Sequence, residues 1–146
     1  ARKRTGTLNG VHGQVVLGNF VGPVEGQKVT VELLSGGTVA ETQTVTLDAN
    51  GNFGMGSVQT GSFGVRIKSS HWLRKLAGTV TLPGGVVSCV LSNGDINGDN
   101  QIDSADFDLL VQNFGTAHTT GDLDGSGVVD SDDFDLLVWN FGSVGD

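Results

Sequence analysis

The chain has 146 residues, of which 37% are hydrophobic, 16% are charged and 24 are glycines, and its formal net charge is −8. This turn-rich and sparsely charged composition excludes a coiled coil and a disordered tail. No apolar run approaches the roughly 20 residues of a membrane-spanning helix. The excess of negative charge disfavours a nucleic-acid partner, because it would repel phosphate groups.

Charge is divided unevenly along the chain. All eight basic residues and four acidic residues precede residue 94, whereas twelve aspartates and no lysine or arginine follow it. This asymmetry predicts two domains, namely a β-sandwich over 11–92 and an acidic module over 93–146, with a basic N-terminal arm or strand over 1–10. Because the sequence opens without Met, we expect it to be a processed piece of a larger protein.

The first part of the chain is predicted to form seven short strands separated by glycine turns. Val29, Val31 and Leu33 alternate with polar residues, as in a strand with one buried face. Asn50-Gly51 is a typical hairpin signal between the third and fourth strands. Such spacing favours a β-sandwich. The predicted strands cover 14–20, 28–34, 38–48, 52–58, 63–69, 76–82 and 85–91.

Two segments of this region carry a family resemblance. GPVEGQKVTVELL (22–34) and TLDANGNFGMGSVQTGSFGVRIKSS (46–70) resemble the carboxypeptidase regulatory-like, or transthyretin-like, sandwich domains of bacterial extracellular proteins. The resemblance implies a sandwich fold and no catalytic activity. The chain also shows three scattered histidines and no Ser or Cys nucleophile in a recognisable setting, so we expect no enzyme and no catalytic residue.

The acidic part contains two repeated loops, GDINGDNQIDSADFDLL (94–110) and GDLDGSGVVDSDDFDLL (121–137). Oxygen-bearing side chains fall at positions 1, 3, 5, 9 and 12, with a backbone carbonyl available at position 7, which is the spacing of a calcium loop. Hard oxygen donors without His or Cys suit calcium, so two calcium ions are predicted. The candidate ligands are Asp95, Asn97, Asp99, Gln101, Asp103 and Asp106, and Asp122, Asp124, Ser126, Val128, Asp130 and Asp133.

An amphipathic helix is predicted after each loop. Ser104 and Ser131 are the expected N-caps, and Gly115 and Gly142 are expected to end the helices. Apolar residues recur at helical spacing in both segments, and four of them are expected to form a small core. These four are Phe107, Phe114, Phe134 and Phe141.

The paired segments 94–115 and 121–142 are identical at 14 of 22 positions, and this loop–helix repeat resembles a dockerin. The resemblance implies a two-domain fold class, in which an all-β sandwich is followed by a small α-helical dockerin-like module. It also implies a cohesin-like protein partner. The residues at the family's partner-reading positions that we select as candidate contacts are Ser104, Ser131, Gln112 and Trp139.

The resulting hypothesis is a non-enzymatic, calcium-stabilised attachment or structural module, secreted or at the cell surface, where millimolar calcium would fill its loops. Two alternatives remain open. The first is a filament protomer, in which the basic arm reaches the acidic module of a neighbouring copy. The second is a carbohydrate-binding module that uses Trp72 or Trp139 as an aromatic platform.

Overall fold

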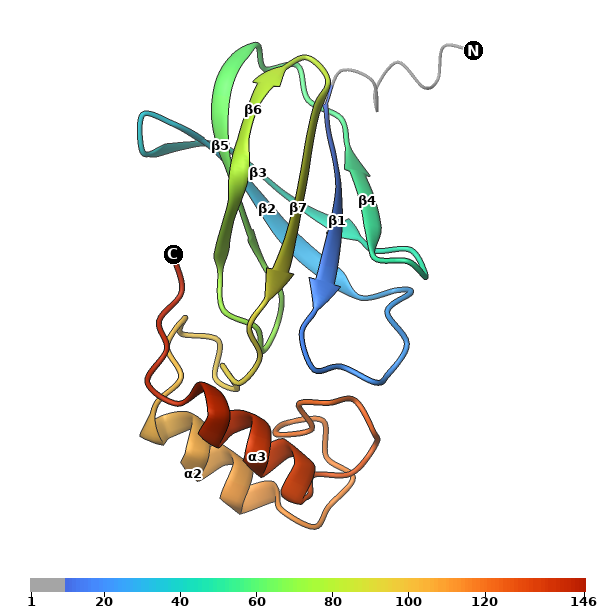
Figure 1. Ribbon diagram of the computed structural model, residues 1–146, viewed down its shortest axis with the longest axis vertical. Coiled ribbons are helices and arrows are strands. Elements are labelled where there is room, and N and C mark those ends of the chain that lie inside the picture. The colour runs from blue at the N-terminus through green and yellow to red at the C-terminus, as the bar shows by residue number, and fades with distance from the viewer. Residues whose placement is uncertain (1–9) are drawn as a thin grey trace. The chain divides into compact units, whose positions relative to one another are not determined.

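The structure is a computed structural model that describes residues 10–146 (Figure 1). Except for Gly10, the predicted N-terminal arm over 1–10 lies outside the described residues. The elements are β1 (Val11–Leu17), β2 (Lys28–Ser35), β3 (Thr38–Thr46), β4 (Asn52–Met55), β5 (Gly61–Lys68), β6 (Lys75–Leu82), β7 (Gly85–Leu91), α2 (Ser104–Asn113) and α3 (Ser131–Asn140).

The strands form two sheets, with the orders β4-β1-β7 and β3-β2-β5-β6. In the four-stranded sheet, β2 pairs antiparallel with both β3 and β5. The alternation predicted for β2 is confirmed, because Val29, Val31 and Leu33 are all buried. The sequence pattern therefore places the strands to within a few residues.

The turn at Asn50-Gly51 does not form the predicted hairpin. It connects β3 to β4, and these two strands belong to different sheets. Gly51 has a φ of 80°, and the Asp48 side chain accepts hydrogen bonds from the backbone N–H groups of Asn50 and Asn52, each at 2.9 Å. A turn does form at Asn50-Gly51, but the local sequence does not determine which strands its two flanking strands pair with.

The chain divides into two compact units whose boundaries do not follow the predicted domains. The first, here called the sheet unit, comprises the described residues up to Val16 together with Val24–Lys68 and Lys75–Val90. The second, here called the helical unit, combines Leu91–Asp146 with two segments from the strand region, Leu17–Pro23 and Ser69–Arg74. The predicted fold class is therefore wrong: the chain is a β-sandwich with two short helices, and these do not form a separate C-terminal helical module.

In the helical unit, α2 and α3 lie side by side (Figure 1). Their N-caps are Asp103 and Asp130, one residue before the predicted serines. Each cap belongs to a capping box, closed by Asp106 in α2 and by Asp133 in α3. An aspartate can bond a free N–H of the first turn as well as a serine can, so propensity alone did not separate the two positions.

The core of the helical unit differs from the predicted phenylalanine cluster. Phe107 and Phe134 do meet edge to face, with ring centroids 5.5 Å apart, but Phe114 and Phe141 are about half exposed. The buried apolar cluster comes from the loops as much as from the helices. Its members are Leu73, Ile102, Leu110, Leu123, Val129 and Leu137. Within the described part of the chain, no helix has the length and apolar character needed to cross a bilayer.

Candidate metal centres in the two acidic loops

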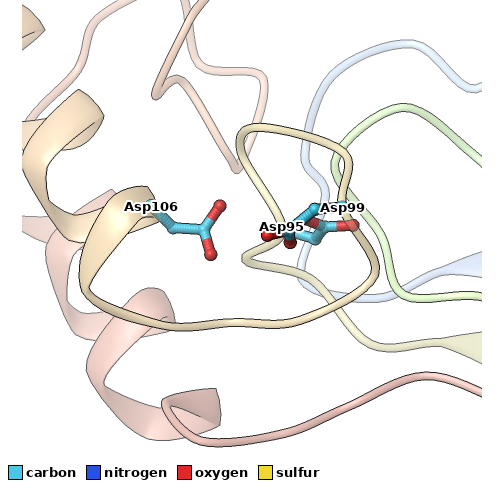
Figure 2. Close-up of side chains that lie close together, drawn as sticks. All are labelled: Asp95, Asp99 and Asp106. Atoms are coloured by element: carbon cyan, nitrogen blue, oxygen red, sulfur yellow. The ribbon is translucent and has the colours of Figure 1, made fainter.

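The first acidic loop brings three carboxylates to one point. One oxygen from each of Asp95, Asp99 and Asp106 lies within 4.8 Å of the other two. Figure 2 shows Asp106 pointing from the start of α2 toward Asp95 and Asp99 in the loop. Asp95 and Asp106 are fully buried, whereas Asp99 is exposed. The loop thus surrounds a site that is lined by carboxylate oxygens and is open to solvent on one side.

Backbone hydrogen bonds fix these carboxylates. Asp106 accepts the N–H of Asn97 on Oδ1 (3.0 Å) and the N–H of Asp103 on Oδ2 (2.9 Å). Asp95 Oδ2 accepts the N–H of Asn100 (2.8 Å). Asn100, at position 6 of the loop, has a φ of 71°, a left-handed conformation that asparagine tolerates.

The second loop gathers three carboxylates 27 residues later, from positions 1, 3 and 12 where the first loop uses positions 1, 5 and 12. One oxygen from each of Asp122, Asp124 and Asp133 lies within 4.8 Å of the other two. Asp133 accepts the N–H groups of Asp124 (3.0 Å) and Asp130 (2.9 Å). Asp122 Oδ2 accepts the N–H of Gly127 (2.9 Å). Both loops therefore organise positions 1 and 12 through equivalent backbone bonds.

The clusters do not include every carboxylate that the spacing selected. Asp103 lies outside the first cluster and caps α2, while Asp130 groups with Asp124 and with Asp132, which the spacing did not select. The remaining candidates lie in the loops as expected. Asn97 Oδ1 accepts the N–H of Asp99 (3.2 Å), the Ser126 hydroxyl donates to the Val128 carbonyl (3.2 Å), and Gln101 forms a β-bridge with Val144. Coordination by all twelve residues stays a prediction.

The buried carboxylates carry an electrostatic cost. Burial raises the pKa of Asp133 to about 6, and the neighbouring charge of Asp124 acts in the same direction. Burial likewise raises the pKa of Asp106. A divalent cation would replace this repulsion with attraction, and an all-oxygen donor set without His or Cys fits calcium. The residues present therefore fit calcium.

A segment from the strand region supports the second loop. The Asp124 carbonyl accepts the N–H groups of Val21 (2.7 Å) and Gly22 (3.3 Å). The Phe20 ring lies so close to Gly125 that a Cβ at that position would come within 2.3 Å of it. These contacts are long-range in sequence, and nothing in the loop repeat predicts them.

Trp72 is not available as a sugar-binding platform. It is fully buried, with the His71 ring stacked on it at 3.9 Å and the Phe20 ring at 5.3 Å. Its Nε1 donates to the Gly18 carbonyl at 3.0 Å. The polysaccharide alternative is therefore wrong as far as it rests on Trp72.

The candidate partner contacts are on the surface. Trp139 is 87% exposed, and Gln112, Ser104 and Ser131 are exposed as well. Between the helices the structure also shows an apolar groove of about 430 Å³, which the sequence analysis missed. Its lining residues are Leu110, Val111, Phe114, Ser131 and Phe134. The apolar spacing along the two helices could have indicated this groove, but we interpreted the spacing as a fully buried core.

Comparison with known proteins shows the fold. No family model and no curated protein matches the chain. Among the solved structures that match are two type II cohesin–X-dockerin complexes from Acetivibrio cellulolyticus. One is an N-terminal interface mutant (TM-score 0.73, 22% identity) and the other a C-terminal interface mutant (TM-score 0.75, 23% identity). Each match covers 94% of this chain and 97% of the other.

A third solved structure, a type II cohesin-dockerin domain from Bacteroides cellolosolvens, is 45% identical over 35% of this chain and covers 85% of its own length. Its TM-score is 0.34, so we draw nothing from it.

The whole-length matches correct two of the sequence-based resemblances. They relate the β-sandwich to type II cohesin–dockerin structures, and neither to a carboxypeptidase regulatory-like domain nor to a dockerin-like pair standing apart from the sandwich. At 22–23% identity these matches show the fold alone, so the expectation that the chain is not an enzyme stays a prediction.

Proposed function

We propose that the chain is a calcium-stabilised attachment module that binds another protein outside the cell. The observation that carries this proposal is the pair of carboxylate clusters, in which buried aspartates converge through the same backbone hydrogen bonds in both loops. The fold agrees with the proposal, since two of the solved structures that share it are cohesin–X-dockerin complexes.

Calcium would occupy the two loops. The ion would supply the positive charge that buried carboxylates at positions 1 and 12 need in order to stay ionised. The chain's own part is to hold these oxygens in place before the ion arrives, which the backbone N–H donors to Asp95, Asp106 and Asp133 do. Millimolar calcium outside the cell suits sites of this kind, so we infer that the module works at the cell surface or as a secreted protein.

The partner we propose is the complementary module of a type II cohesin–dockerin system. The docking face would combine the groove beside Val111 and Phe114 with the exposed ring of Trp139. Aromatic side chains that become buried on binding are frequent hot spots. Gln112, Ser104 and Ser131 would supply polar contacts on the same two helices.

A binding assay tests this proposal. Purified type II cohesin and, in a separate arm, purified type II dockerin would be titrated into the chain in 2 mM calcium and again in excess chelator. We expect one of the two to bind in calcium, to be released by chelation, and to bind Trp139→Ala at least tenfold more weakly. Calcium-independent binding would remove the calcium part of the proposal, and no binding in either arm would contradict the partner.

The two alternatives gain no support from the structure. The filament hypothesis depends on the N-terminal arm, which lies outside the described residues. The polysaccharide hypothesis retains Trp139 alone, since Trp72 is buried.

A further inference from the structure

The two acidic loops differ at position 6. Asn100 and Gly127 both have a positive φ, of 71° and 99° respectively. A Cβ on Gly127 would meet nothing within 4 Å. The Asn100 side chain, in contrast, accepts the N–H of Arg74 on Oδ1 (2.7 Å) and donates from Nδ2 to the Asp146 carbonyl (3.2 Å). An asparagine at this position costs some backbone strain, and here it gains two tertiary hydrogen bonds.

The segment that follows α3 lies along the first loop. Gly142 N–H donates to the Ile102 carbonyl (2.8 Å), and Ile102 N–H donates to the Ser143 carbonyl (2.9 Å). Further along the segment, Gly145 N–H donates to the Asn100 carbonyl (2.9 Å). The first loop therefore bonds to the C-terminal segment at two separate positions.

Arg74 closes the same arrangement from the other side. Its carbonyl accepts the N–H of Asp146 (2.8 Å), and its Nε donates to the Asp146 carbonyl (2.5 Å). Gly145 is essential to this fit, because a Cβ there would lie 2.1 Å from Asn100 Oδ1. We call Asn100, Arg74 and the segment Ser143–Asp146 the C-terminal latch.

The second loop has the first half of this arrangement and lacks the rest. Gly115 N–H donates to the Val129 carbonyl (2.7 Å), and Val129 N–H donates to the Thr116 carbonyl (2.8 Å), as at Ile102. Within residues 10–146, no backbone bond then joins the segment after Thr116 to Gly127. The latch is thus a property of the first loop and not of the repeat.

Asn100 belongs both to the latch and to the acidic cluster. Its side chain and carbonyl bind the C-terminal segment and Arg74, while its backbone N–H donates to the buried Asp95 carboxylate (2.8 Å). Because one residue makes both sets of bonds, docking of the C-terminal segment restrains Asp95, and an ion that restrains Asp95 favours docking.

We propose that the C-terminal latch is reciprocally coupled to calcium binding in the first loop, so that a docked segment raises the calcium affinity of that loop alone. The proposal rests on the calcium function proposed above. It makes Asn100 a positioning residue that acts through Asp95. It also implies that calcium orders the C-terminal segment.

The test measures each loop separately by calorimetric calcium titration. In an Asp122→Ala background, where the first loop is the remaining site, we expect Asn100→Gly to weaken calcium binding about tenfold, the equivalent of losing roughly one net hydrogen bond. In an Asp95→Ala background, where the second loop remains, Asn100→Gly should leave the affinity unchanged. Gly145→Ala, which lies outside the loop, should act like Asn100→Gly, and Val58→Ala, at an exposed position of the sheet unit, is the control without effect.

Amide hydrogen exchange gives a second reading in the otherwise unmodified chain. Calcium should slow exchange at Gly145 and Asp146, and this protection should be lost in Asn100→Gly. Equal first-loop affinities in Asn100→Gly, Gly145→Ala and the parent would overturn the latch and leave calcium binding intact. A parent chain that binds no calcium would instead overturn the proposed function.

Discussion

The sheet unit and the helical unit bury different chemistry. The buried side chains of the sheet unit are apolar, and among them Val31, Leu33, Val65 and Ile67 are fully enclosed. Every buried polar or charged side chain within the described residues belongs to the helical unit. They are Ser69, Asn93, Asp95, Asp106, Asp124 and Asp133.

This difference shows how each unit is stabilised. Apolar burial stabilises the sheet unit without any additional component. Four buried aspartates oppose the folding of the helical unit unless their charge is compensated, and its small apolar cluster offers little to offset them. The sheet unit should therefore be indifferent to calcium, whereas the helical unit should depend on it.

Removal of calcium should produce the largest effect. In excess chelator we expect the helical unit to lose its protection from amide hydrogen exchange, together with the helical circular dichroism of α2 and α3, because the buried carboxylates then repel one another. The sheet unit should keep its protected amides. A helical signal that is unchanged by chelation would contradict the contrast between the units.

A cavity in the sheet unit should give the converse result. Leu33 is fully buried in β2, between β3 and β5. Leu33→Ala should lower the free energy of unfolding of this unit by about 2–5 kcal/mol. Urea titrations with and without calcium measure the loss, which should be the same in both. If calcium restored the lost stability, the stability of the sheet unit would depend on the helical unit.

Without calcium, a lower pH should stabilise the helical unit. This is the opposite of its usual effect on proteins that contain paired carboxylates. The pKa of Asp133 is about 6 in the folded chain against an ordinary value of 3.8, so the folded state binds this proton more tightly than the unfolded state does. The stability gained by protonation is present below pH 3.8 and is lost as the pH rises through 6.

In excess chelator the helical unit should therefore retain more helical circular dichroism at pH 5 than at pH 7. With calcium bound the order should reverse, because protons compete with the ion for the same carboxylates. The same pH trend with and without calcium would exclude Asp133 as part of an ion site.

The smallest effect on stability is expected at the surface of the helical unit. Trp139 is 87% exposed, so Trp139→Ala should change the free energy of unfolding by no more than about 0.5 kcal/mol. Chemical denaturation in calcium checks this. A loss above about 2 kcal/mol would mean that Trp139 stabilises the fold and does not await a partner.

The sequence alone predicted the features that repeat locally. Period-two alternation located the strands, as Val29, Val31 and Leu33 show, and the loop spacing brought Asp95, Asp99 and Asp106 together. It did not predict what the loops contact elsewhere. The bonds from Val21 and Gly22 to Asp124, and from Arg74 to Asn100, join residues far apart in sequence, and no periodic pattern encodes such pairs.

The errors have related physical causes. Two adjacent polar residues can both cap a helix, so Asp103 was passed over for Ser104. A helical spacing of apolar residues does not say which of them is covered, so Phe114 and Phe141 were placed in a core that leaves them half exposed. The grouping of Leu17–Pro23 and Ser69–Arg74 with the helices is a tertiary property, which is why the predicted fold class was wrong.

Calorimetric titration of calcium into the chain tests the central claim most directly. The account predicts two ions per chain, one ion for Asp106→Asn, and two for Asp108→Asn, an exposed aspartate of the same helix that lies outside both clusters. The absence of calcium binding by the parent chain, or two ions still bound by Asp106→Asn, would contradict it.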